Sequence, residues 1–204
     1  MSAWREWRKQ TFGTPYMVWH DGIDPDHFVS MTAERREEGI ALLPEGIAER
    51  DWLAAVGARM LELTGLIPVL EASLEGSSGR FCAEAAIAVD VLGGDGNLAR
   101  NAVLRALSHP SWFSRMDAAI GLRHLPGAGV VETLLKQVAG DPDFLVRHHS
   151  AESLLHLGGI EPASIVEHQH VFNDLVAEPN GERDDGVVEC HRRASESLRA
   201  LLGD

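Results

Sequence analysis

The sequence predicts an all-α protein of about five helix pairs, and three observations support this fold class. Apolar residues recur at spacings of three and four through runs of about ten to fifteen residues, as on one face of a helix. Short clusters of Gly, Pro, Asp and Ser, such as Gly140-Asp141-Pro142, separate these runs. No segment alternates apolar and polar residues with the period of two that marks a half-buried strand.

One short pattern recurs along the chain: a small residue followed three and six positions later by larger residues, mostly aliphatic. In its fourth copy these are Ala151, Leu154 and Leu157. The five copies lie at intervals of 29, 33, 32 and 44 residues. They begin at Gly57, Ala86, Ala119, Ala151 and Ser195. Because a period in the low thirties is typical of helix-pair repeats, each copy is expected to mark the first helix of a pair, with the small residue allowing a close approach.

The remaining helices are expected between and ahead of these copies. Second helices are predicted at 66–74, 98–107, 130–139 and 166–177. A further amphipathic helix is predicted over 32–50, beginning at Thr32, with a bend or break at Pro44. The polar segment 178–185 accounts for the longer last interval, and we expect it to be an exposed loop.

The segment DPDFLVRHHSAESLLHLGG (141–159) resembles a HEAT repeat of the bacterial type found in phycocyanobilin lyases. The matching positions are Asp141, Asp143, Val146, Arg147, Ala151, Leu154 and Leu157. The resemblance covers residues 50–160 best, and it implies a right-handed α-solenoid over 31–204 with second helices lining a concave face. It also implies binding to other proteins more than catalysis.

In that family an arginine of each repeat is hydrogen-bonded to the neighbouring repeat. The corresponding positions here are Leu53, Cys82, Arg115, Arg147 and His191. Two of the five keep the arginine, so the other pairs are expected to depend more on apolar packing.

Aromatic residues are concentrated near the N-terminus, where five fall within nineteen residues: Trp4, Trp7, Phe12, Tyr16 and Trp19. We expect residues 1–30 to fold back as a cap, because the exposed end of a repeat array has to be covered. The alternative is that these aromatics dock a partner protein, a common role for tryptophan in interfaces.

The composition favours an acidic cytoplasmic protein. A formal net charge of −13 disfavours direct binding to nucleic acid or to anionic membranes. Cys82 and Cys190 fit neither a disulfide framework nor a metal spacing, and both are expected to be buried thiols. We find no export signal in the sequence and no apolar run of the roughly 18 residues that a membrane span needs.

Ten histidines raise the question of a metal site. The deoxyhypusine hydroxylase branch of HEAT-like enzymes holds iron with His-Glu dipeptides, but this chain has only Glu167-His168, in the reverse order. His148, His149 and His156 share one helix and are expected to be solvated or hydrogen-bonded, so no metal or other cofactor is predicted. Nor does the sequence contain a nucleophile elbow, a phosphate loop, a dinucleotide fingerprint or an indication of a bilin pocket.

The expected function is that of a non-enzymatic protein-binding adaptor or scaffold. Its partner is expected to be a basic protein, and a sharper version is an immunity-type inhibitor of a basic toxin, because complementary charge speeds association. The candidate partner-binding residues are polar positions of the second helices and two N-terminal tryptophans: Glu71, Glu75, Arg105, Glu132, Lys136, His168, His170, Asp174, Trp4 and Trp7. The alternative is a HEAT-like lyase or another ligand- or metal-dependent enzyme, and the oligomeric state is left open.

Overall fold

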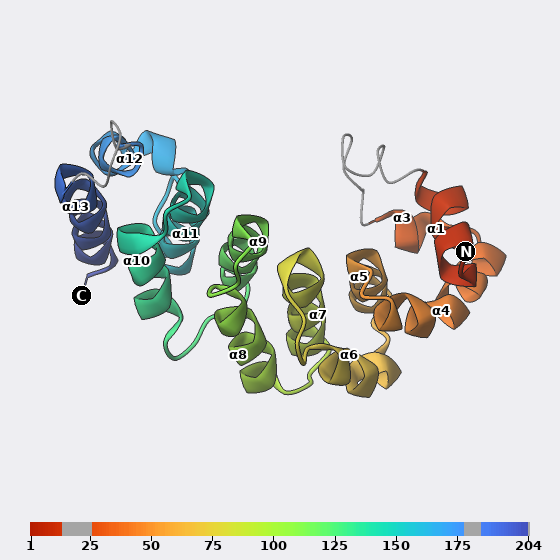
Figure 1. Ribbon diagram of the computed structural model, residues 1–204. Helices are drawn as coiled ribbons and strands as arrows, with labels where there is room; N and C mark the ends of the chain where they lie inside the picture. Colours follow the sequence, from red (N-terminus) through yellow and green to blue (C-terminus); the bar gives the residue numbers. More distant parts are fainter. Residues whose placement is uncertain (14–25, 178–184, 204) are drawn as a thin grey trace. The chain divides into compact units, whose positions relative to one another are not determined.

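The computed structural model describes residues 1–13, 26–177 and 185–203, and its regular elements in these ranges are all helices (Figure 1). Twelve α-helices lie there, which confirms the all-α prediction. The chain divides into two compact units: unit 1 comprises Met1–Ser77 and Glu84–Ala102, and unit 2 comprises Ser78–Ala83 and Val103–Asp204. Helices α7 (Gly79–Val91) and α8 (Gly96–Ala106) contribute residues to both.

Unit 1 is built around a central helix. Helix α4 contacts α1, α5 and α6, and the short α3 contacts α5. Besides parts of α7 and α8, the described residues of unit 1 form α1 (Ala3–Phe12), α3 (His27–Ser30), α4 (Ala33–Ala48), α5 (Trp52–Met60) and α6 (Ile67–Ser73). Predicted helices at 32–50 and 66–74 therefore correspond to α4 and α6.

Helix α4 begins where the sequence indicates but does not end at its proline. The Thr32 side chain caps it by accepting a hydrogen bond from the Arg35 backbone N–H. The helix continues through Pro44 to Ala48, so the possible break is not observed. Pro44 is exposed while its neighbours Leu43 and Ile47 are fully buried, and their burial compensates for the hydrogen bond that proline cannot donate.

Glycines allow the helices of unit 1 to approach closely. A Cβ at Gly57, which begins the first copy of the repeated pattern, would lie 2.6 Å from the Phe28 ring. At Gly46 it would lie 2.7 Å from both the Trp4 ring and the Ala54 Cβ. The small residue therefore acts as predicted in this first copy.

In its described residues unit 2 contains five helices besides its parts of α7 and α8. They are α9 (Trp112–Leu122), α10 (Val130–Gly140), α11 (Phe144–Leu157), α12 (Gln169–Leu175) and α13 (Asp185–Leu202). Consecutive helices pack together, as α10 does with α11 and α12 with α13, and α9 packs on α11. The predicted second helices at 98–107, 130–139 and 166–177 correspond to α8, α10 and α12, the last being shorter than expected. The expected loop over 178–185 lies, except for Asp185, outside the described residues.

The last helix is placed differently from the first helix of a regular pair. Its small residue, Ser195, donates a hydrogen bond from Oγ to the Leu135 carbonyl oxygen of α10 at 3.0 Å. Helix α13 packs mainly on α10 and α12 and less on α11, whereas α9 packs directly on α11. Because α12 has 7 residues and α13 has 18, the longer helix covers α10 instead (Figure 1).

Two arginines join the helices of unit 2 at their N-terminal turns. The Arg115 guanidinium donates two hydrogen bonds to the Asp141 carboxylate, at 2.7 and 2.9 Å. Arg147 donates to the Asp141 and Pro142 carbonyl oxygens ahead of its own helix and to the Leu175 carbonyl oxygen at the end of α12. The resemblance to HEAT repeats implied this linking role.

The other positions of the arginine slot are filled differently. Leu53 and Cys82 are fully buried, and His191 Nε2 lies 3.0 Å from the Ala177 carbonyl oxygen. The prediction of a buried thiol is therefore confirmed for Cys82. It is wrong for Cys190, which is half-buried with its sulfur 3.2 Å from Arg193 Nη2. Among the helices described, none has an apolar stretch long enough to cross a bilayer.

Candidate functional site

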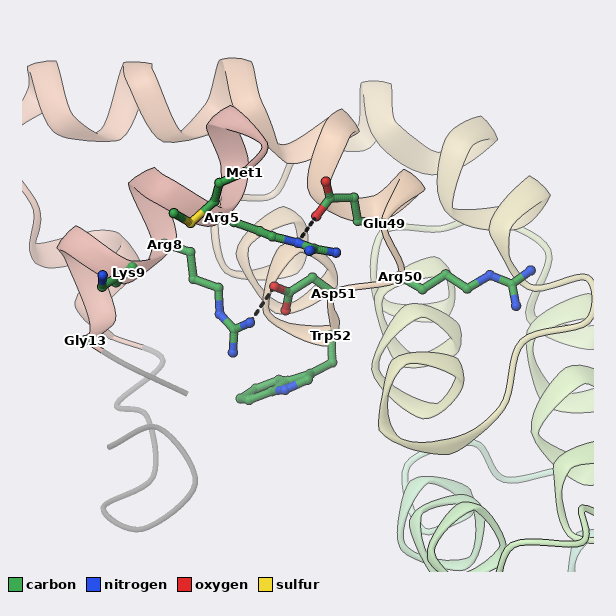
Figure 2. Close-up of a pocket in the computed structure, with 9 residues that line it drawn as sticks. All are labelled: Met1, Arg5, Arg8, Lys9, Gly13, Glu49, Arg50, Asp51 and Trp52. Carbon is green, nitrogen blue, oxygen red and sulfur yellow. Dashed lines mark hydrogen bonds and ion pairs between the residues drawn. The ribbon is translucent and has the colours of Figure 1, made fainter. Parts of the chain in front are cut away.

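Unit 1 contains an open cavity of about 460 Å³ between α1 and the segment that joins α4 to α5 (Figure 2). This volume lies within the range of small-molecule sites. Nine described residues line it: Met1, Arg5, Arg8, Lys9, Gly13, Glu49, Arg50, Asp51 and Trp52. Four of these side chains are cationic and two are carboxylates, so the lining carries a positive excess in an acidic chain.

Asp51 connects the walls of this cavity. Its Oδ2 accepts hydrogen bonds from Arg8 Nη1 at 2.7 Å and from Trp4 Nε1 at 2.9 Å. Its Oδ1 accepts from the Leu53 backbone N–H and so caps α5. The same carboxylate therefore starts one helix and fastens α1 beside it.

A second ion pair lies at the rim. Figure 2 shows Arg5 and Arg8 extending from α1 toward Glu49 and Asp51, and Arg5 Nε lies 2.8 Å from Glu49 Oε2. Hydrogen bonds from Ser2 and then Arg5 lower the pKa of the Glu49 carboxyl. Lys9 has no ion-pair partner in the described part of the chain. Cationic groups beside the indole of Trp52 suit an anionic ligand with an apolar portion.

Arg50 lines the same cavity but is turned toward another element. It adopts a positive φ of 57°, and its guanidinium donates to the Gly76 and Glu75 carbonyl oxygens at 2.8 and 3.1 Å. Figure 2 shows its side chain extending away from Asp51. Arg50 therefore braces the turn after α6.

The two tryptophans proposed as partner anchors are packed inside unit 1. Trp4 is 0% exposed and Trp7 is 3% exposed, with their rings stacked at 5.5 Å. The guanidinium of Arg35, from α4, lies 5.2 Å from the Trp7 ring. In this conformation the tryptophans hold α1 on α4, and contact with a partner stays a prediction that would require α1 to detach. Tyr16 and Trp19 lie outside the described residues.

The polar residues predicted on the second helices are divided between the two units. In unit 1, Glu71 Oε1 accepts a hydrogen bond from the Asp95 backbone N–H at 2.8 Å, and Glu75 is exposed. In unit 2, Arg105, Lys136 and His170 are exposed. They remain available for contact, and their role stays a prediction.

The other predicted residues of unit 2 are bonded within the fold, two of them to arginines of α13. Glu132 accepts two hydrogen bonds from Arg199, at 2.7 and 2.9 Å, and this arginine lowers the pKa of the carboxyl. Asp174 accepts from Arg193 Nη2 at 2.6 Å. His168 Nε2 lies 2.9 Å from the Pro162 carbonyl oxygen. Part of the polar face expected to be free is therefore paired within the fold.

One group on α11 combines metal-ligating side chains. His148 Nε2 and His149 Nδ1 each lie 3.4 Å from an oxygen of Glu152, and one ligand atom from each residue fits within 4.8 Å of the others. Burial lowers the pKa of His149, the nearby His148 and Arg123 lower it further, and Glu152 opposes the shift. The group contains no His-Glu dipeptide, so that signature does not indicate it. Its signal was a carboxylate three and four positions after two adjacent histidines, on one face of a helix.

The arginines and the carboxylates of the chain differ in how many of them are paired with other groups of the chain. Most arginines donate to carboxylates, carbonyls or hydroxyls of the fold itself, as Arg59 does to Glu84 and Arg123 to Ser153. Several exposed carboxylates have no ion pair among the residues described. These are Glu34, Glu37, Glu62, Glu75, Asp90, Glu161 and Glu167. The negative net charge of the chain is therefore displayed at the surface of both units.

Comparison with known proteins identifies no relative: neither a family model nor a curated protein nor a solved structure matches the chain.

Proposed function

We propose that this protein is a non-enzymatic adaptor or scaffold that binds a basic protein. The observation that carries the proposal is the difference in pairing: most arginines donate to other groups of the chain, while several exposed carboxylates on both units lack an ion-pair partner among the described residues. Such a surface attracts a cationic partner and accelerates its association.

We also propose that the helices form a HEAT-like, right-handed α-solenoid. The Arg115–Asp141 and Arg147–Leu175 junctions, the packing of consecutive helices and the close approach at Gly57 all support this architecture. In a solenoid each repeat contacts its neighbours and leaves an extended surface for a partner.

The sharper form of the proposal is an immunity-type inhibitor of a basic toxin. A nuclease uses cationic side chains to bind phosphates, and an acidic protein in the same cytoplasm could cover them. The expected result is loss of nuclease activity at a stoichiometric ratio of the two proteins.

The test begins with the purified full chain and a partner isolated from its native cells at low salt. Binding would be measured by calorimetry over a salt series, for the wild type and for Glu161→Gln/Glu167→Gln. The proposal expects a basic partner whose affinity falls with salt and falls again in this variant. Ser164→Ala, an exposed change between the two glutamates that alters no charge, is the matched control and should not weaken binding. A neutral or acidic partner would overturn the proposal. So would an affinity that changes neither with salt nor in the Glu161→Gln/Glu167→Gln variant.

A second candidate is a ligand-dependent role, as in a HEAT-like lyase or another enzyme. The cationic cavity of unit 1 favours it. The test is a titration with inorganic phosphate and with citrate, comparing Lys9→Ala with Lys136→Ala. Weaker binding confined to Lys9→Ala would support the candidate, and no saturable binding would count against it.

A further inference from the structure

We propose that His148, His149 and Glu152 of α11 bind a divalent transition-metal ion, with Zn²⁺ the best fit. The site lies in unit 2 and is independent of the proposed partner binding. Two imidazoles and one carboxylate make a donor set that suits Zn²⁺ better than the oxygen-preferring Mg²⁺ or Ca²⁺.

The spacing of the three side chains follows from the helix. Glu152 stands four positions after His148 and three after His149, so its carboxylate lies between the two rings on one face of α11. This face is only partly open, since the three side chains are 18%, 26% and 20% exposed. A partly closed face lowers competition from water and favours binding of an ion.

The distances match a tetrahedral ion. Zn–N and Zn–O bonds of about 2.0–2.1 Å place tetrahedral ligand atoms about 3.3–3.5 Å apart. Both His–Glu152 separations are 3.4 Å. The two rings have centroids 5.2 Å apart and planes at 89°, and side-chain rotation has to bring their ligand nitrogens, which lie within 4.8 Å of each other, to the tetrahedral separation.

An unsatisfied atom points to a missing partner at this position. His149 Nδ1 is buried and has no hydrogen-bond partner, although Glu152 Oε2 is near it. Buried polar atoms are nearly always bonded, so each exception calls for an explanation. A bound ion would satisfy this nitrogen and would accept the lone pair that a neutral imidazole offers.

The charges around the site set the expected strength. The neutral form of an imidazole is the one that binds metal. Glu152 supplies one negative charge, while the guanidinium of Arg123, held 3.4 Å from the Ser153 hydroxyl, repels a cation. Three protein ligands leave a fourth position open for water or for a donor from another molecule.

The test uses the full chain without a histidine tag, stripped with chelator and titrated with Zn²⁺ against a chromophoric competitor. We expect one ion per chain, and visible Co²⁺ absorption of the intensity typical of a tetrahedral site. His149→Ala and Glu152→Gln should each weaken binding at least about tenfold, since each removes a ligand or a charge. His170→Ala, which removes an exposed histidine of α12, should leave it unchanged.

A stability readout separates binding from folding. Zn²⁺ should raise the thermal midpoint of the wild type and of His170→Ala but not that of Glu152→Gln, which keeps the shape of the side chain. If His149→Ala does not fold, Glu152→Gln decides the matter. Absence of stoichiometric binding, or equal binding by all variants, would overturn the proposal.

Discussion

Replacement of Arg115 by Met should be one of the most damaging single changes in unit 2. Its guanidinium makes a two-point pair with the Asp141 carboxylate, and the two side chains are only 12% and 3% exposed. Arg115 Nη1 also donates to the carbonyl oxygens of His109 and Pro110, both at 3.0 Å. The substitution preserves the apolar stem but removes every one of these bonds.

The size of the effect follows from what stays behind. Without Arg115, the Asp141 carboxylate is left buried and keeps a hydrogen bond from the Asp143 backbone N–H at 2.9 Å. Removing one partner of a buried ion pair typically costs about 3–5 kcal/mol. We expect Arg115→Met to lower the free energy of unfolding by about 3 kcal/mol. The double change Arg115→Met/Asp141→Asn should lower it by less than the sum of the two single changes, because neither charge then remains.

The assay is urea unfolding followed by the helical circular dichroism signal. If the two units unfold in separate steps, the change should appear in the step that belongs to unit 2. Arg192→Met is the matched control: Arg192 also pairs with two carboxylates, those of Glu189 and Glu196, but its side chain is 51% exposed. Exposed pairs contribute little, so its midpoint should equal that of the wild type. An Arg115→Met midpoint no lower than that of this control would refute the reasoning.

Two further predictions concern packing and pH. Gly46→Ala should lower the free energy of unfolding by about 1–3 kcal/mol, because the new methyl would meet an indole of α1 and a methyl of α5. Gly65→Ala is its control in the same unfolding assay, because a Cβ at Gly65 has nothing within 4 Å. Burial and then Arg147 lower the pKa of His191, so the unfolded chain takes up the proton first and the folded state loses stability as the pH falls below about 6.5. His191→Gln cannot titrate, and its thermal midpoint should fall less than that of the wild type between about pH 7.5 and about pH 5.5. Equal falls in the two proteins would contradict this.

The local elements could be predicted from the sequence because their signals are local. The helical period and the flanking turns place α6, α8 and α10 to within a few residues. Thr32 marks the start of α4 by its own hydrogen bond. The linking role of Arg115 and Arg147 could also be anticipated, because the resemblance supplied a three-dimensional context that spacing alone does not contain.

The failures are those of long-range packing. Glu132 and Arg199 form their pair across 67 positions, and no local pattern indicates that α13 lies on α10. Helix α12, with 7 residues, is also shorter than the helix predicted over 166–177. As a result, two of the predicted partner-binding carboxylates, Glu132 and Asp174, are paired with arginines of α13. The histidine group was missed for a different reason. Its spacing is visible in the sequence, but the expected ligand pattern was the His-Glu dipeptide of an iron site.

The turn ahead of α11 has a dynamic consequence. Surface turns usually exchange their amide protons quickly, because a small local opening is enough to expose them. Here the Asp143 amide donates to the Asp141 carboxylate, which also accepts hydrogen bonds from Arg115. Arg147 donates to the Asp141 and Pro142 carbonyl oxygens. Opening this turn requires the release of both guanidinium groups together, so we expect its amide to exchange only when unit 2 as a whole unfolds.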